Sequence, residues 1–162
     1  MRAAERRSRP ARLSGVPAYI AVVGPAQTSD RCELDSAVAV GAELARRGAV
    51  VVCGGLGGVM EAACRGAHDA GGTTLGLLPG DDRAAANRWV TVAVATGMGE
   101  LRNGLVVRAS DALIAVGGAY GTLSEIALAL KAGTPVIGLG TWDIPGVVAA
   151  PDAVAAVDLA LG

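Results

Sequence analysis

The sequence predicts an α/β fold, in which a doubly wound parallel sheet of about six to seven strands lies between two layers of helices. Short apolar runs alternate with longer stretches whose apolar residues recur every three or four positions, as in βαβ units. Glycine-rich joints follow the strands, at the sheet edge where ligands of such folds bind. The chain has 162 residues, which suits one domain, and we place that domain at residues 16–162.

The first half of the chain supplies three of the strands and two of the helices. The expected strands cover residues 19–23, 49–53 and 73–78. The first helix is expected over residues 33–47, because Leu34, Val38 and Leu44 share one side and Gly48 is a typical stop. The second helix is expected over residues 59–70, after the turn "GGLGG".

The second half repeats the alternation. Strands are expected over residues 89–95, 112–116 and 135–139. One helix after "TGMGELRN" ends near residue 108, another ends at residue 132, and a short helix follows residue 152. No internal repeat or linker interrupts the series.

Charge separates the N-terminus from the rest of the chain. Five arginines lie within residues 1–12, which hold only Glu5 as an acid. Because this segment lacks apolar periodicity, we interpret residues 1–15 as a disordered, solvated tail rather than a nucleic-acid arm. The remainder is acidic and nearly free of stacking aromatics, which argues against a nucleic-acid binder.

The apolar content restricts the class of protein further. Hydrophobic residues make up 52% of the chain, yet no stretch reaches the ~18–20 residues that a membrane span needs. We therefore expect the excess apolar surface to cover both sheet faces or a subunit interface; the second alternative favours a homo-oligomer, and we expect a homodimer or homotetramer. The three cysteines lack C-x-x-C spacing, which argues against a disulfide framework or zinc site and fits a cytoplasmic protein.

The chain lacks the residues of three familiar phosphate-binding architectures. Its single lysine, Lys131, lies late in a helix, which excludes a P-loop and disfavours a pyridoxal-phosphate enzyme. A dinucleotide site needs G-x-G-x-x-G after the first strand and an acid ending the second. Here the first turn is "GPAQTS" and the second strand ends at Cys53-Gly54, so NAD and FAD are unexpected.

Two glycine-rich turns remain as candidate phosphate cradles, because glycine lets a backbone approach a ligand and helix starts attract anions. They are Gly54–Gly58 after the second strand and Gly117–Thr122 after the fifth. The phosphate-binding or nucleotide-binding residues that we predict from these turns are Gly54, Gly55, Gly57, Gly58, Gly118, Ala119, Tyr120, Gly121 and Thr122. We expect Met60, at the start of the following helix, to belong to the core.

Three segments resemble the LONELY GUY (LOG) family, and more closely its bacterial relatives, which include molybdenum-cofactor carrier proteins. The segments are "GGLGGVMEAA", "ELRN" and "GGAYGTLSE". The resemblance covers roughly residues 18–142. It implies a Rossmann-like fold. It also implies hydrolysis of a nucleoside 5′-monophosphate to free base and ribose 5-phosphate, with no cofactor required.

The LOG motif P-G-G-x-G-T-x-x-E, with an Arg-Lys pair upstream, can be laid on this chain without gaps. Its arginine and glutamate fall on Arg102 and Glu125, which the resemblance implies are catalytic. The chain departs from the motif at three positions, Asn103, Gly117 and Ala119, where the family has Lys, Pro and Gly. Asn103 keeps hydrogen-bonding capacity without charge, and we include it among the binding residues.

Two interpretations of Glu125 stand at this point. Thr122-x-x-Glu125 has the spacing of a capping box, in which the glutamate serves only the helix start. In the other interpretation, the carboxylate lies one turn deeper than the phosphate and meets the ribose. Arg102 is either an ordinary exposed arginine at a helix start or a ligand-binding residue, because a helix start disfavours a cation.

Several other residues carry a weaker signal. Asp81 and Asp82 fit a solvated turn better than a metal site, and His68 is expected at the surface. Cys53 is expected to be a buried small hydrophobe near the pocket. Trp142 either stacks on a base or covers a subunit contact.

Two functional hypotheses follow from these residues. In the first, the protein is a phosphoribohydrolase that uses Arg102 and Glu125. In the second, it is a non-catalytic carrier or sensor of a phosphorylated pterin, such as the molybdenum cofactor, or of a nucleotide. The small phosphorylated ligand is common to both.

Overall fold

The computed structural model describes residues 15–162 as seven strands and five α-helices, with two short 3-10 helices between them. The strands are β1 (Tyr19–Val23), β2 (Val50–Cys53), β3 (Thr74–Leu78), β4 (Val92–Ala95), β5 (Ala112–Val116), β6 (Val136–Leu139) and β7 (Val147–Ala149). The helices are α1 (Arg31–Arg46), α2 (Val59–Asp69), α3 (Asn103–Arg108), α4 (Tyr120–Ala132) and α5 (Ala153–Leu161), with the 3-10 helices η1 (Arg83–Ala85) and η2 (Gly99–Arg102). No helix in residues 15–162 is long and apolar enough to cross a membrane.

The strands form one parallel sheet in the order β4-β3-β2-β1-β5-β6-β7. The chain runs outward from β1 to β4 on one side, then returns to the centre and runs outward from β5 to β7. The order therefore reverses between β1 and β5, which pair directly. In doubly wound sheets this reversal opens a crevice beyond the carboxyl ends of the two central strands. The predicted fold class is confirmed.

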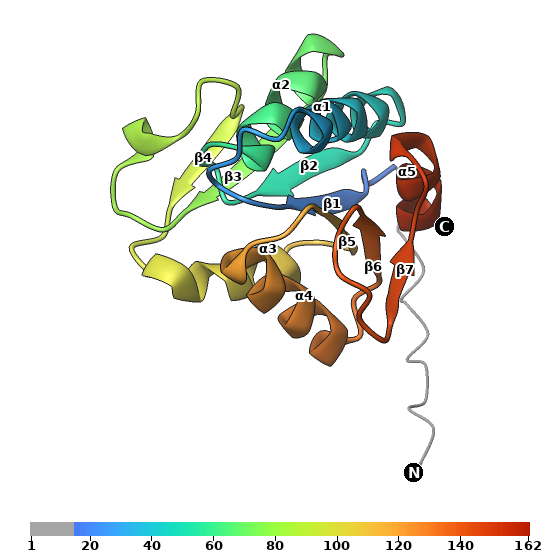
Figure 1. Cartoon of the computed structure of the whole chain (residues 1–162). Coiled ribbons are helices and arrows are strands. Elements are labelled where there is room, and N and C mark those ends of the chain that lie inside the picture. The colour runs from blue at the N-terminus through green and yellow to red at the C-terminus, as the bar shows by residue number, and fades with distance from the viewer. Residues whose placement is uncertain (1–14) are drawn as a thin grey trace.

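Helices cover both faces of the sheet (Figure 1). α1, α2 and α5 lie on one face, where Val40, Leu44 and Val157 pack on alternate residues of the central strands. α3 and α4 lie on the other face, where Val106 and Ile126 pack on the intervening strand residues. Because both faces are covered, β1, β2, β5 and β6 are continuous apolar runs rather than alternating ones.

The structure corrects some predicted boundaries. β4 begins at Val92 rather than residue 89, because Asn87 bonds the backbone there: its side chain accepts from Trp89 N (3.1 Å) and its carbonyl from Val90 N (3.1 Å). α1 begins earlier than expected, since Asp30 caps it through Cys32 N (2.8 Å). β7 was not located in the sequence, and most of the predicted tail, residues 1–14, lies outside the described residues.

Candidate functional site

A cavity of about 690 Å³ lies at the carboxyl edge of the sheet, beside the crevice between β1 and β5. Segments that follow β1, β2, β3, β4 and β5 all contribute to its wall. Its lining residues are Gly24, Ala26, Leu56, Met60, Pro79, Gly99, Glu100, Leu101, Arg102, Asn103, Gly104, Ala119, Tyr120, Gly121, Thr122, Ser124, Glu125 and Leu128. Its volume lies in the range of small-molecule sites, ~300–1,000 Å³.

The start of α4 forms one wall with its first backbone amides uncovered. Ala119 is the N-cap residue, and its methyl group cannot accept a hydrogen bond from the helix. The N–H groups of Tyr120, Gly121 and Thr122 therefore lack an acceptor in their own helix. Thr122 turns its hydroxyl backward to accept from Ala119 N (3.2 Å). The helix dipole and these amides together favour an anion.

This geometry corrects the capping interpretation of Glu125. Thr122 is the third residue of α4 rather than its cap, which puts Glu125 sixth, beyond reach of the helix start. Ala119 N is also engaged by Thr122, so this amide, predicted to bind phosphate, is already satisfied. The glutamate is therefore left free of any role in capping.

Glu125 is 6% exposed and lines the cavity. Within residues 15–162 its carboxylate has one polar neighbour, the Arg102 guanidinium, with Oε1 and Nη1 3.8 Å apart. Burial raises the pKa of Glu125 to about 7, against the opposing effect of the nearby Arg102 charge. The carboxyl group can therefore exchange a proton near neutral pH, as general acids and bases do.

Arg102 ends η2 and is 7% exposed, so its interpretation as an ordinary surface arginine is wrong. Its guanidinium donates to Asn103 Oδ1 and, at 3.4 Å, to the Gly54 carbonyl. Burial lowers the pKa of Arg102, while the charge of Glu125 raises it. Its Nε is buried without a hydrogen-bond partner among the described residues. A buried donor left unpaired is costly, and a ligand oxygen would satisfy it.

Asn103 connects the arginine to the start of α4. Its Oδ1 accepts from Arg102, and its Nδ2 donates to Ser124 Oγ (3.1 Å), which in turn donates to the Gly121 carbonyl (2.7 Å). Asn103 therefore holds the guanidinium beside Glu125 without adding charge. Ser124 is a site residue that sequence reasoning missed, because a lone serine within a helix carries no local signal.

The glycines of the turn after β2 do not line the cavity that holds Arg102 and Glu125. A Cβ at Gly54 would lie 2.7 Å from Arg102 Cζ, so glycine there lets the guanidinium approach the backbone. Gly55 faces Leu78 and does not line the cavity, and neither does Gly57. Gly58 lines a different pocket. From the same segment, Leu56 and Met60 line the cavity instead, so Met60 is both buried and ligand-facing.

Gly118 does not line the cavity, and it lies against Trp142 instead. A Cβ there would lie 2.6 Å from the six-membered ring of Trp142. The indole thus packs against the turn between β5 and α4, and only glycine leaves room for it. Trp142 stays partly exposed.

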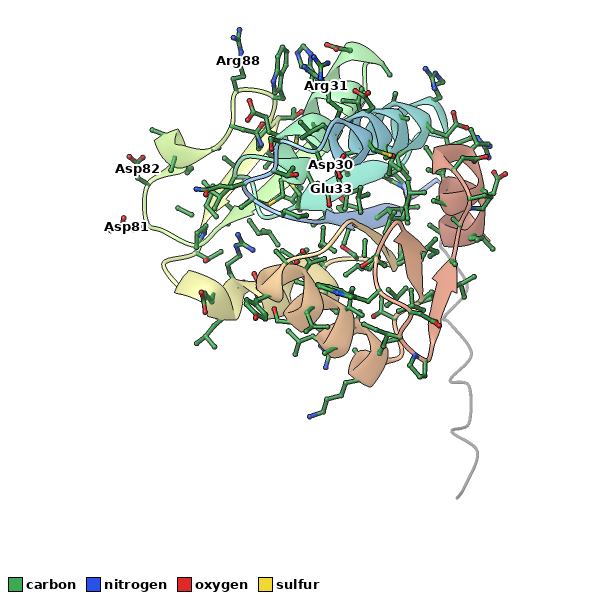
Figure 2. The ribbon with its side chains drawn as sticks, viewed as in Figure 1. Asp30, Arg31, Glu33, Asp81, Asp82 and Arg88 are labelled. Carbon is green, nitrogen blue, oxygen red and sulfur yellow. The ribbon has the colours of Figure 1, made fainter. Side chains whose placement is uncertain are left out.

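The residues with weaker signals lie apart from the cavity. Asp81 and Asp82 lie on an outer loop (Figure 2), where Asp82 caps η1 through Ala84 N (2.8 Å). Within residues 15–162 no group of three or more His, Cys, Asp or Glu side chains could hold a metal. His68 is exposed and its ring lies 5.0 Å from that of Trp89. Cys53 is buried, as expected.

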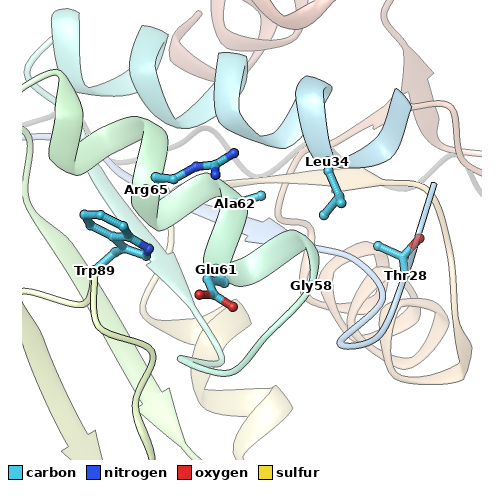
Figure 3. Close-up of a pocket in the computed structure, with 7 residues that line it drawn as sticks. All are labelled: Thr28, Leu34, Gly58, Glu61, Ala62, Arg65 and Trp89. Atoms are coloured by element: carbon cyan, nitrogen blue, oxygen red, sulfur yellow. The ribbon is translucent and has the colours of Figure 1, made fainter. Parts of the chain in front are cut away.

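A second, smaller pocket of about 270 Å³ lies between the starts of α1 and α2 and the loop before β4. Figure 3 shows Thr28 and Trp89 at its two ends, with Glu61, Ala62 and Arg65 of α2 between them. Sequence reasoning did not locate it, because its members come from three segments with no shared motif. Leu34 and Gly58 complete its lining.

Comparison with known proteins gives a family match over nearly the whole described chain. The model of the SLOG cluster4 family matches residues 17–158. An uncharacterized protein of Archaeoglobus fulgidus is 49% identical over 100 residues, 62% of this chain and 66% of that protein. The cytokinin riboside 5′-monophosphate phosphoribohydrolase LOG of rice (Oryza sativa) is 37% identical over 57% of this chain and 39% of its own length. The chain thus spans less than two thirds of either curated relative.

Solved structures extend the match. The molybdenum cofactor binding protein of Rippkaea orientalis has a TM-score of 0.84 and 36% identity, covering 90% of this chain and 96% of that one. The molybdenum cofactor carrier protein of Chlamydomonas reinhardtii has a TM-score of 0.80 and 35% identity, and the match covers 88% of this chain and 95% of that one. The resemblance to LOG proteins and molybdenum-cofactor carriers, inferred from the motifs, is confirmed.

Proposed function

The chain belongs to the SLOG cluster4 family, and from this premise we propose that its cavity binds a nucleoside 5′-monophosphate and hydrolyses the N-glycosidic bond. The observation that carries the proposal is the buried carboxyl of Glu125, whose pKa is raised to about 7 and which faces Arg102 in the cavity. The rice relative is named for this reaction on cytokinin ribotides.

The phosphate of the ligand lies at the start of α4. The free amides of Tyr120, Gly121 and Thr122 supply donors, and the helix dipole adds a favourable potential. Arg102 offers its unpaired Nε and its charge from the facing wall. Ribose then extends from the phosphate into the cavity, where Glu125 lies one helical turn further along α4.

At the ribose, Glu125 stabilises the positive charge that develops on the sugar as the bond to the base breaks. The same carboxylate orients a water, which adds to the anomeric carbon. Water and the monophosphate thereby give the free base and ribose 5-phosphate. The proton that the attacking water loses replaces the one that passes to the departing base, and the reaction needs no cofactor.

The test is release of free base from AMP and isopentenyl-AMP, followed by liquid chromatography. Glu125→Gln keeps the shape of the side chain and removes its charge, and we expect it to lower the rate about a hundredfold or more. Glu61→Gln, on α2 outside the cavity, is the matched control and should keep the rate. No base release by the wild-type protein from a panel of nucleoside monophosphates would rule out the hydrolase.

A second function, carriage of a phosphorylated pterin such as the molybdenum cofactor, is favoured by a separate observation. The carrier-type structures superpose on 88–90% of this chain and on 95–96% of their own length. In addition, Asn103 stands where the LOG motif has a lysine and serves to hold Arg102. A carrier binds its ligand saturably without turnover, and Glu125→Gln leaves that binding intact.

A further inference from the structure

Two thiols lie in contact one layer beneath the cavity. Cys53 ends β2 and Cys64 lies in the middle of α2, and their Sγ atoms are 3.5 Å apart. Both side chains are fully buried and free. They form a small cluster with Met60, against which Leu56 and Trp89 pack. Met60 and Leu56 also line the cavity, whereas neither cysteine does.

We propose that Cys53 and Cys64 are a modification site that forms a reversible disulfide, and that its formation changes ligand affinity in the Arg102–Glu125 cavity. A disulfide needs sulfurs about 2.0 Å apart, so the two atoms approach by about 1.5 Å. Since the sulfurs already touch, no element has to unfold for this. The effect on affinity rests on the proposed function, whereas the disulfide does not.

Each of the two thiols is the hydrogen-bond partner of the other, so the loss of a proton from one depends on the other. The pKa of Cys64 is lowered, chiefly by the hydrogen bond from the Cys53 thiol and further by Asn87 and Thr74. The pKa of Cys53 is raised by its bond to Cys64 and by burial. The thiolate is the nucleophile in such chemistry, so a thiolate at Cys64 attacks and Cys53 resolves; with the two roles exchanged, the same disulfide forms.

The oxidant in this proposal is a small peroxide, which reaches the buried thiols when the side chains of Leu56 and Met60 at the cavity wall move. The Cys64 thiolate attacks one oxygen of hydrogen peroxide, which gives a sulfenic acid and hydroxide. That hydroxide takes the proton of Cys53, whose thiolate then attacks the Cys64 sulfur. The S–S bond forms, the S–O bond breaks, and the second hydroxide takes up the proton that Cys64 lost earlier. Two thiols are oxidised by two electrons in all, and one peroxide is reduced to two waters.

The reaction is coupled to the ligand site through the turn after β2. Cys53 Sγ accepts a hydrogen bond from Gly55 N (3.3 Å), and the carbonyl of Gly54 accepts one from Arg102 (3.4 Å). When the Cys53 sulfur moves toward Cys64, Gly55 N loses its acceptor and the turn that holds the arginine shifts.

The disulfide is tested directly in a Cys32→Ser background, because Cys32 is exposed and would react on its own. The protein is treated with hydrogen peroxide, denatured, alkylated and weighed by mass spectrometry. We expect two thiols to escape alkylation, one cross-linked peptide pair, and full reversal by dithiothreitol. Cys64→Ala in the same background should give no intrachain bond. If both thiols are still alkylated after the folded protein has been treated with peroxide and then denatured, the proposal is wrong.

The coupling is tested by titrating reduced and oxidised protein with AMP, where we expect a change of about fivefold or more in affinity. Hydrogen exchange of the peptide that holds residues 54–58 gives a second readout that needs no ligand, and we expect faster exchange after oxidation. Unchanged exchange and unchanged AMP affinity in disulfide-bonded protein would overturn the coupling. A failure of AMP to bind either form counts against the proposed function alone.

Discussion

At the scale of single residues, the pair Arg102 and Glu125 concentrates the chemistry of the cavity. Both side chains are buried, and their charged atoms are 3.8 Å apart, which is too far for a hydrogen bond. Burial disfavours the charge on each, and their mutual attraction offsets only part of this cost. A ligand phosphate beside Arg102 and a ribose hydroxyl beside Glu125 would supply the missing contacts.

Because burial disfavours the charge on Glu125, the stability of the protein is expected to depend on pH. The pKa of Glu125 rises from 4.5 to about 7 on folding, so between these values the folded state binds more protons than the unfolded state. The free energy of unfolding therefore falls as pH rises from about 4.5 to about 7, by roughly 3 kcal/mol for this group. The free energy of unfolding is measured by denaturant titration at pH 5, 6, 7 and 8.

Glu125→Gln isolates the effect, because every other carboxyl group is common to both proteins. The stability difference between wild type and the variant should change in favour of the variant as pH rises. A difference that stays flat from pH 5 to pH 8 would mean that Glu125 titrates at its ordinary value.

At the scale of elements, the turn after β2 supports η2. Gly54 lies in contact with the guanidinium of Arg102, and its carbonyl is one of the acceptors of that group. Gly118, after β5, likewise leaves room for the Trp142 ring. The absence of a side chain thus serves close packing at both turns.

Gly54→Ala tests this role. The new Cβ would lie 2.7 Å from Arg102 Cζ, so the guanidinium must leave the carbonyl and move relative to Glu125. We expect a loss of about tenfold or more in AMP affinity or turnover, and a stability cost of about 1–3 kcal/mol.

The matched control is Gly80→Ala, since nothing lies within 4 Å of a Cβ at that position. It should change neither AMP affinity nor thermal stability. Wild-type affinity in Gly54→Ala would show that the arginine tolerates displacement.

At the scale of the whole molecule, exposed apolar side chains lie on the elements that form the cavity. Leu101 is 77% exposed and Tyr120 is 92% exposed, and both line the cavity. Further exposed apolar side chains come from the same region, formed by η2, α3 and α4: they are Met98, Leu105, Leu123 and Leu128. Exposed apolar surface of this kind marks an interaction site.

We expect a second copy of the chain to cover this surface, in a homodimer or homotetramer. Leu101→Asp should then reduce the mass measured by light scattering after gel filtration toward that of a monomer. Leu159→Asp, at an exposed leucine of α5 on the opposite face of the sheet, is the control and should leave the assembly intact. A monomeric wild-type protein would contradict the expectation.

Much of the architecture could be predicted because strands and helices of this kind are local patterns. β1 and β5 were located to the residue, since each is a short apolar run that ends at a glycine. β7 was not located, because its residues Val147–Ala149 are partly exposed at the sheet edge and resemble a loop. The start of β4 was misplaced by Asn87, whose hydrogen bonds are not visible in a hydrophobic pattern.

The sequence by itself determined the class of fold, the turns that meet at one sheet edge, and the pair Arg102 and Glu125 as candidates. It did so because strand order and motif spacing depend on local chemistry and on few topological rules. Only the tertiary structure decided that Glu125 is no helix cap, that Asn103 holds Arg102, and that Cys53 touches Cys64. These depend on burial and on distances between segments far apart in the chain, which no local pattern records.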